Sequence, residues 1–192
     1  MKRIIAALQV SLDGKIEGPN GELDWVGTWE DDNDLRDRVD TCVLGGGMWP
    51  GYEQYWTSIL ADPTAVLEFT GRPAHTGEVE YARWADRTPH VVVSTTMAEP
   101  SWANARVVRD LDGVAALKDG DGADIFAVGG ATLVSNLMNR GLVDELQLIV
   151  HPLVLGPGTA LFKDVTDRHQ LRLESATPSP SGHVVLTYSV HR

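Results

Sequence analysis

Short runs of hydrophobic residues recur along the chain, separated by glycine-containing turns and helical patterns. The run at 4–12 is hydrophobic on both alternating faces, which is typical of a central strand buried on both sides. Near the C-terminus, two stretches with alternating hydrophobic and polar residues flank a turn rich in proline and serine, which predicts an antiparallel hairpin. The predicted strands are residues 4–12, 41–44, 90–94, 105–108, 124–128, 145–150, 170–175 and 183–188.

Stretches with a helical period lie between most of these strands. The stretch 131–140 has four hydrophobic residues on one face and ends before Gly141, a common residue after a helix C-terminus. Asp112 is a candidate N-terminal cap for the next stretch upstream. The predicted helices are residues 30–39, 52–60, 114–118 and 131–140, with a shorter helical piece at 78–85 in a long excursion. Strands and helices alternate first and strands dominate later, which predicts one α/β domain over 1–192 with a mostly parallel sheet and an antiparallel C-terminal edge.

Charge and composition narrow the possible partners. The 192 residues carry a formal net charge of −11, and the isoelectric point is near 4.8. A basic surface for nucleic acid or anionic lipid is therefore missing, and we expect neither as a partner. One cysteine excludes an intrachain disulfide, and the six histidines are scattered, so no metal site is expected. The hydrophobic N-terminal run is too short for a signal peptide, and we expect a cytoplasmic protein that does not span a membrane.

Two glycine turns are candidates for a phosphate site. Gly129 and Gly130 end a predicted strand and precede a helix, whose first amides and positive dipole end favour an anion. The stretch 45–47 follows another strand in the same way. Neither spacing matches the dinucleotide or nucleotide-triphosphate glycine motifs, so each turn alone also fits a simple tight turn. Two such turns after strands of one sheet would lie at the same edge, which favours a ligand site there.

Several polar and aromatic residues have two open interpretations each. Asp13 follows the first strand and either orients a substrate or accepts backbone hydrogen bonds in a turn before Gly14. Trp25 is either a stacking wall for a ligand or a hydrophobic plug between loop and core. The acidic stretch 30–34 either begins a helix, where its charge suits the helix dipole, or supplies one carboxylate to the ring nitrogens of a ligand.

A set of sequence segments is shared, in order and spacing, with a known superfamily. These segments are 11–16, 39–46, 55–56, 91–94, 124–133, 141–146, 151–158 and 161–162. They resemble the dihydrofolate-reductase-like superfamily, and most closely its branch formed by the reductase domain of riboflavin biosynthesis, the RibD C-terminal type. The resemblance implies a three-layer α/β/α sandwich on a mixed, mostly parallel sheet of about eight strands. It also implies a homodimer.

The resemblance further implies a nicotinamide dinucleotide and a set of site residues. Asp13 would be the catalytic residue near the nicotinamide and substrate. The substrate-binding residues would be Ser11, Gly14, Trp25 and Asp32. The cofactor-binding residues would be Gly45, Gly46, Gly47, Met48, Trp49, Ser94, Thr95, Thr96, Gly129, Gly130, Ala131, Thr132 and Leu133.

Two positions depart from the pattern of such proteins and affect the expected cofactor. Gly46 and Thr95 stand where relatives carry arginines that bind the 2′-phosphate of NADPH. NADPH therefore remains the expected cofactor only if another cation reaches the site, and NADH is the alternative. The candidate cations are Arg72, Arg83, Arg87 and Arg109.

We expect a stand-alone NAD(P)H-dependent reductase, which transfers hydride to a small heterocyclic substrate, pyrimidine- or pterin-like, or to a carbonyl substrate. The zinc deaminase half of the bifunctional riboflavin enzyme cannot be built from a single cysteine. A dinucleotide- or small-ligand-binding module of the same fold, with little or no reductase activity, is the alternative. A structural dimer without a ligand is the third hypothesis. It does not explain the open glycine turns, because a purely structural sheet does not need them.

Overall fold

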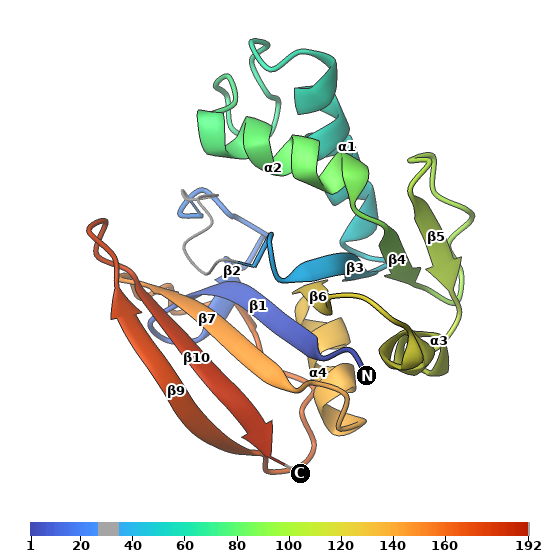
Figure 1. Cartoon of the computed structure of the whole chain (residues 1–192). Coiled ribbons are helices and arrows are strands. Elements are labelled where there is room, and N and C mark those ends of the chain that lie inside the picture. Colours follow the sequence, from blue (N-terminus) through green and yellow to red (C-terminus); the bar gives the residue numbers. More distant parts are fainter. Residues whose placement is uncertain (27–34, 192) are drawn as a thin grey trace.

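The structure, a computed structural model, describes residues 1–26 and 35–191 (Figure 1). Its strands in these ranges are β1 (Ile4–Ser11), β2 (Lys15–Glu17), β3 (Val39–Gly45), β4 (His90–Val93), β5 (Ala105–Val108), β6 (Asp124–Gly129), β7 (Glu145–His151), β8 (Thr159–Ala160), β9 (Gln170–Pro178) and β10 (Val184–His191). The helices are α1 (Trp49–Ala61), α2 (Thr76–Arg87), α3 (Asp112–Ala115) with the 3-10 turn Ala116–Asp119, and α4 (Ala131–Asn139). None of these helices, within the described ranges, is long and apolar enough to cross a membrane.

Eight strands form one sheet in the order β5-β4-β3-β6-β1-β7-β10-β9. The strands from β5 to β7 are parallel to their neighbours, and β10 is antiparallel to both β7 and β9. The predicted mostly parallel sheet with an antiparallel C-terminal edge is therefore confirmed. Because parallel strands end at the same edge, the turns after β3, β4, β5 and β6 are brought together there.

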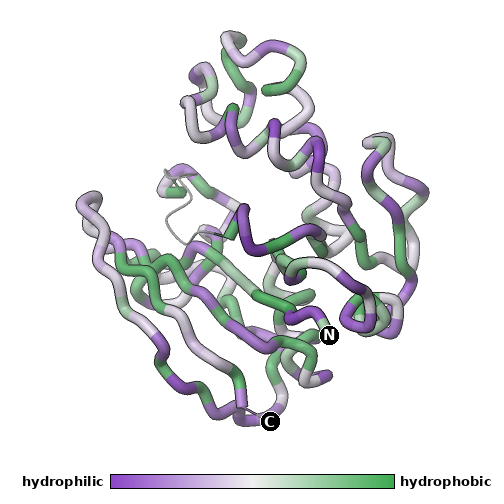
Figure 2. The backbone as a smooth tube through the Cα atoms, in the orientation of Figure 1, coloured by the Kyte–Doolittle hydropathy of each residue, from purple (hydrophilic) through white to green (hydrophobic). Residues whose placement is uncertain are grey.

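Helices cover both faces of the sheet, which confirms the three-layer arrangement (Figure 1). In β1, Ile4 and Leu8 pack with Leu137 of α4 on one face. On the other face, Ile5 packs in a cluster with Trp56 of α1. Burial on both faces explains why the β1 sequence is hydrophobic without alternation. Figure 2 shows hydrophilic and hydrophobic positions alternating along the outer strand β9, and every β9 residue is exposed.

The predicted helix at 30–39 is wrong where the structure describes it. Residues 36–38 form a turn and Val39 begins β3, while 30–34 lie outside the described residues. Leu35 and Val39 are both buried against the α1 side of the sheet. Their spacing of four residues therefore reflects the burial of two separate positions, and not one face of a helix.

A small second sheet was not predicted from the sequence. Lys15 pairs with Ala160 and Glu17 pairs with Thr159, which joins β2 to β8 in antiparallel fashion. Strands of two and three residues have too little sequence for a period, and their pairing depends on the fold around them.

The predicted cap at Asp112 is also wrong. The residue before α3 is Leu111, and the Gly113 amide donates to Asp110 Oδ1 at 3.0 Å. Asp112 lies in the first turn and forms an ion pair with Arg140 at 2.6 Å. The N-cap position is therefore Leu111, and the carboxylate that accepts a first-turn amide is that of Asp110 and not that of Asp112.

An aromatic cluster joins α1 and α2 to the sheet around a buried histidine. The Tyr52 hydroxyl lies 3.1 Å from His90 Nε2 and 3.1 Å from the Tyr81 hydroxyl. The His90 ring stacks on Trp102 with ring centroids 5.2 Å apart. Only 1% of His90 is exposed. Burial lowers its pKa from 6.5 to about 4, because a charged imidazolium would lose its hydration.

His90 should make the stability of the protein depend on pH. In the unfolded chain His90 takes up a proton near pH 6.5, whereas in the folded chain it does so only near pH 4. The free energy of unfolding is therefore unaffected by His90 above pH 6.5 and falls as the pH is lowered from 6.5 to about 4. The shift corresponds to about 3 kcal/mol. The free energy of unfolding in urea should therefore fall less between pH 7 and pH 4.5 for His90→Gln than for the wild type. His191→Gln, at an exposed position, should behave like the wild type, and an equal loss in all three proteins would contradict the prediction.

Candidate functional site

A cleft opens at the edge where the parallel strands end. It has a volume of about 370 Å³ and lies between the turns after β3, β4 and β5 and the first turn of α4. The residues that line it are Gly45, Gly46, Gly47, Val93, Ser94, Thr95, Arg109, Asp110, Leu111, Thr132, Leu133 and Asn136. Three segments singled out in the sequence thus meet around one cavity.

The predicted cofactor residues divide into two groups in the structure. Those that line the cleft are Gly45, Gly46, Gly47, Ser94, Thr95, Thr132 and Leu133. Those that do not line it are Met48, Trp49, Thr96, Gly129, Gly130 and Ala131. The side chain of Trp49 is 1% exposed and donates from Nε1 to Glu53 at 2.9 Å, so it belongs to the aromatic core.

The glycines before α4 sit beside the turn that follows β3. A Cβ atom at Gly45 would lie 3.9 Å from the Gly130 amide nitrogen and 3.6 Å from Leu133 Cβ. A Cβ atom at Gly130 would meet nothing within 4 Å, so this position faces open space. The first amides of α4 lack partners inside the helix and carry the positive end of its dipole, which suits a phosphate group.

The turns after β3 and β4 touch at Gly46. Its amide donates to the Val93 carbonyl at 2.9 Å. A Cβ atom at Gly46 would lie only 2.6 Å from Ser94 Cβ, so any larger residue would push the two turns apart. Close packing of the turns is thus the physical reason for a glycine where the resemblance leads one to expect an arginine.

Arg109, directly after β5, closes the cleft on the side of the β4 turn. Its Nη1 donates to the Ser94 carbonyl at 3.1 Å and to the Met97 carbonyl at 2.8 Å. The Ser94 hydroxyl in turn accepts the Met97 amide at 3.0 Å. Arg109 is among the candidate cations, whereas Asp110 is a lining residue that no motif predicted. Its place just after a strand of the same parallel set is the signal that could have found it.

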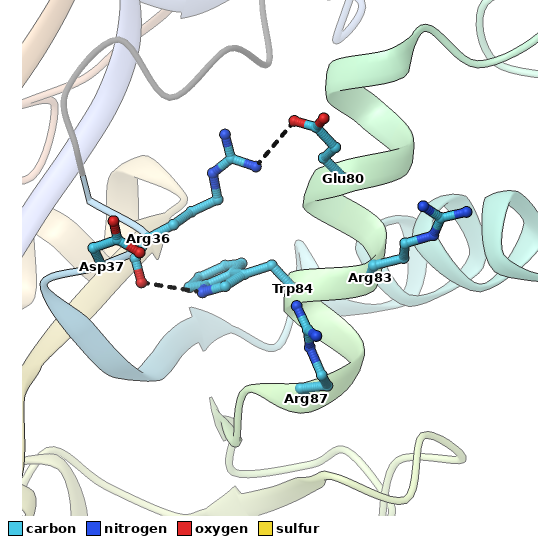
Figure 3. A pocket seen from close by; sticks show the side chains of 6 residues that line it. All are labelled: Arg36, Asp37, Glu80, Arg83, Trp84 and Arg87. Atoms are coloured by element: carbon cyan, nitrogen blue, oxygen red, sulfur yellow. Dashed lines mark hydrogen bonds and ion pairs between the residues drawn. The ribbon is translucent and has the colours of Figure 1, made fainter.

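The other candidate cations lie elsewhere. Arg72 is paired with Glu78, with Nη1 2.7 Å from Oε2. Arg83 and Arg87 line a second cavity of about 360 Å³, together with Trp84 of α2 and two residues that precede β3 (Figure 3). That cavity lies beside the amino ends of β3 and β4, whereas the cleft lies at the carboxyl ends of these strands.

Asp13 holds two loops together at the end of β1. Its carboxylate accepts the Ser11 hydroxyl at 2.7 Å and the amides of Leu155 and Gly156 at 3.0 and 2.8 Å. These hydrogen bonds, the one from Ser11 above all, lower the pKa of Asp13 to about 2. The side chain is exposed and ionised at neutral pH, so it can orient or attract a group but cannot donate a proton. Gly14 follows in the left-handed region, with φ +75°.

Trp25 packs against the end of β7. Its ring meets the His151 ring edge to face, with centroids 5.1 Å apart. His151 Nε2 lies 2.7 Å from Gln9 Oε1, and burial lowers the pKa of this histidine. His151 pairs in register with Ser11, which brings Trp25 to the same end of the sheet as Asp13. Asp32, the remaining predicted substrate residue, lies outside the described residues.

Metal ligands do not gather in the described part of the chain. Residues 1–26 and 35–191 contain no group of three histidine, cysteine, aspartate or glutamate side chains that could hold an ion. Cys42 is buried, and burial raises the pKa of its thiol far above the usual value. The thiol is therefore neutral and a poor ligand.

The fold and the cleft define an α/β protein with a cavity at the carboxyl ends of its parallel strands, where ligands commonly bind in sheets of this kind. The model of one family, the RibD C-terminal domain, matches residues 2–185, and the chain belongs to this family. A protein called uncharacterized protein YyaP, from Bacillus subtilis, is 35% identical over 97% of this chain and 94% of its own length.

Solved structures share the fold. A putative riboflavin biosynthesis protein from a Shewanella species superposes with a TM-score of 0.70 at 21% identity, over 99% of both chains. Dihydrofolate reductase from Enterococcus faecalis, complexed with NADP(H), superposes with a TM-score of 0.66 at 15% identity, over 99% of this chain and 97% of the enzyme. The predicted dihydrofolate-reductase-like fold is therefore confirmed.

Proposed function

We propose that the protein is a stand-alone NAD(P)H-dependent reductase. Its substrate would be a small heterocycle of the pyrimidine or pterin type, or a carbonyl compound. The observation that carries this proposal is the single cleft in which the turns 45–47 and 94–95 meet the first turn of α4. The family and the names of the neighbouring structures, a riboflavin biosynthesis protein and a dihydrofolate reductase, support the same reaction class.

The cleft and the adjoining turn before α4 fit a dinucleotide. The glycines at 45–47 let the backbone approach a ligand, and the open position at Gly130 leaves room for a pyrophosphate before the α4 amides. The nicotinamide, when bound, supplies the hydride, and the protein positions it and shapes the electrostatics. Asp13 would keep a negative charge near the substrate, and Ser11, Gly14 and Trp25 would form the wall behind it.

A ligand-binding module with little or no reductase activity is the second candidate. The absence of arginine at Gly46 and Thr95 favours it, because those positions offer no charge to a 2′-phosphate. The two candidates differ in whether the bound ligand is turned over. Tight binding of a ligand without reduction of any carbonyl, imine or pterin compound would favour the module.

A fluorescence titration with NADPH and, separately, NADH is the first test. Six tryptophans provide a donor signal that reduced nicotinamide quenches by energy transfer. Saturable quenching by either cofactor is the expected result. No binding of either at millimolar concentration would overturn the reductase proposal.

We further propose that the protein forms a homodimer through its C-terminal edge. Leu171 and Leu173 of β9 are 38% and 53% exposed on the outermost strand of the sheet. Exposed leucines on an edge strand are typical of a contact surface. Sedimentation should give twice the chain mass for the wild type and a monomer for Leu173→Lys. Val66→Lys, at another exposed position, should remain dimeric, and a monomeric wild type would contradict the proposal.

The cytoplasmic location, the absence of a bound metal and the absence of nucleic-acid and membrane partners stay predictions.

A further inference from the structure

Arg109 is the only basic side chain among the described residues that line the cleft. The chain as a whole is strongly acidic, with a net charge of −11, so a cation at this place is a local exception. Its guanidinium donates two hydrogen bonds, both from Nη1 and both to backbone carbonyl oxygens. Carbonyls fix the position of the group without neutralising its charge.

The geometry leaves one edge of the guanidinium for a ligand. An arginine side chain carries five N–H donors on three nitrogens, and the Nε and Nη2 edge matches two oxygens of a phosphate. Because Nη1 is held by the Ser94 and Met97 carbonyls, the fork is oriented before any ligand arrives. A phosphate bound there therefore loses little affinity to the ordering of this side chain.

The neighbouring turns exclude the alternative positions for such a cation. Gly46 cannot carry a side chain without a clash at Ser94, whose Cβ would be 2.6 Å away. Thr95 lines the cleft but has no charge. Arg109 occupies the space beside both, because its guanidinium lies on the turn that contains Ser94 and Thr95.

We propose that Arg109 binds the 2′-phosphate of NADPH and makes the protein prefer NADPH over NADH. This inference rests on the reductase proposal, since it assigns the cofactor of the same cleft. Asp110 is the opposing group, because a carboxylate there would suit the ribose hydroxyls of NADH. Its Oδ1 accepts the Gly113 amide at 3.0 Å, which commits one oxygen to the start of α3.

The experiment compares dissociation constants for NADPH and NADH by tryptophan quenching, at low and at physiological ionic strength. The wild type should bind NADPH at least about tenfold more tightly than NADH, which is typical of a charge-assisted bidentate contact. In Arg109→Gln most of this difference in affinity should disappear, because NADPH binds more weakly while the affinity for NADH is unchanged. Arg109→Lys keeps the charge without the fork and should fall between the two.

Matched controls separate a specific contact from general charge and from damage to the fold. Arg106→Gln makes the same charge change at an exposed position of β5 that does not line the cleft, and it should keep the wild-type preference. An unchanged NADH affinity in Arg109→Gln shows that the turn at 94–97 is intact. The NADPH affinity should also fall more steeply with salt in the wild type than in Arg109→Gln.

Each outcome decides between the proposals. If NADPH binds tightly and Arg109→Gln alters the preference no more than Arg106→Gln does, Arg109 is not the phosphate ligand, and the reductase proposal stands. If the wild type prefers NADH, the inference is overturned and Asp110 becomes the discriminating residue. If neither cofactor binds, the reductase proposal fails and this inference fails with it.

Discussion

Gly130→Leu is expected to abolish the binding of a nicotinamide dinucleotide. The Gly130 position faces open space beside the turn that follows β3, so a leucine side chain would fill the room required by a pyrophosphate. Separating the phosphates from the first amides of α4 should weaken binding by about 100-fold or more. The measurement is the titration of tryptophan fluorescence with NADPH.

The folded state should tolerate this change. Gly130 has φ −83°, which other residues adopt readily, and a Cβ atom there meets no neighbour within 4 Å. Gly51→Leu is the matched control, since Gly51 also faces open space but lies in α1 and not in the turn that precedes α4. It should bind the cofactor as the wild type does. Unchanged affinity in Gly130→Leu would place the dinucleotide elsewhere.

Asp13→Asn is expected to lower turnover by about tenfold or more and to leave cofactor affinity within about twofold, as removal of one charged, hydrogen-bonded group at a reaction site does. The amide replaces a permanent negative charge and can no longer accept three hydrogen bonds in the same way. The Leu155 and Gly156 amides would lose their shared acceptor. Steady-state kinetics and cofactor titration, on the substrate identified by screening, separate the two effects.

The pH dependence sharpens the test of Asp13. With a pKa of about 2, this carboxylate stays ionised down to acidic pH, so turnover in the wild type should show no loss from Asp13 between pH 4 and 8. Asp62→Asn changes another exposed carboxylate that accepts hydrogen bonds in a turn, and it should leave turnover unchanged. Equal loss of turnover and cofactor affinity in Asp13→Asn, or no loss of either, would remove Asp13 from the mechanism.

The elements that carry the site were readable from the sequence because each has a local cause. Burial on both faces makes β1 hydrophobic throughout, and the glycines after β3 and β6 mark the ends of parallel strands. Strands that are parallel end at one edge, so the meeting of the turns 45–47 and 94–95 follows from the strand pattern.

Other features could not be read from the pattern because distant contacts decide them. Val39 and Leu35 show a helical spacing, yet one begins a strand and the other lies before a turn. The sheet of β2 and β8 joins segments about 145 positions apart, in strands too short to have a period. It forms only because the fold places the segments that follow β1 and β7 side by side.

The site residues divide along the same line. The sequence by itself determined which strands end in glycine, serine or aspartate, because those residues set local backbone conformation and bonding. Only the tertiary structure decided that Asp13 is tied to amides at Leu155 and Gly156, and that Arg109 rests on the carbonyls of Ser94 and Met97. The physical reason is that such hydrogen bonds join residues far apart along the chain, and only the packing of the folded sheet brings them within reach.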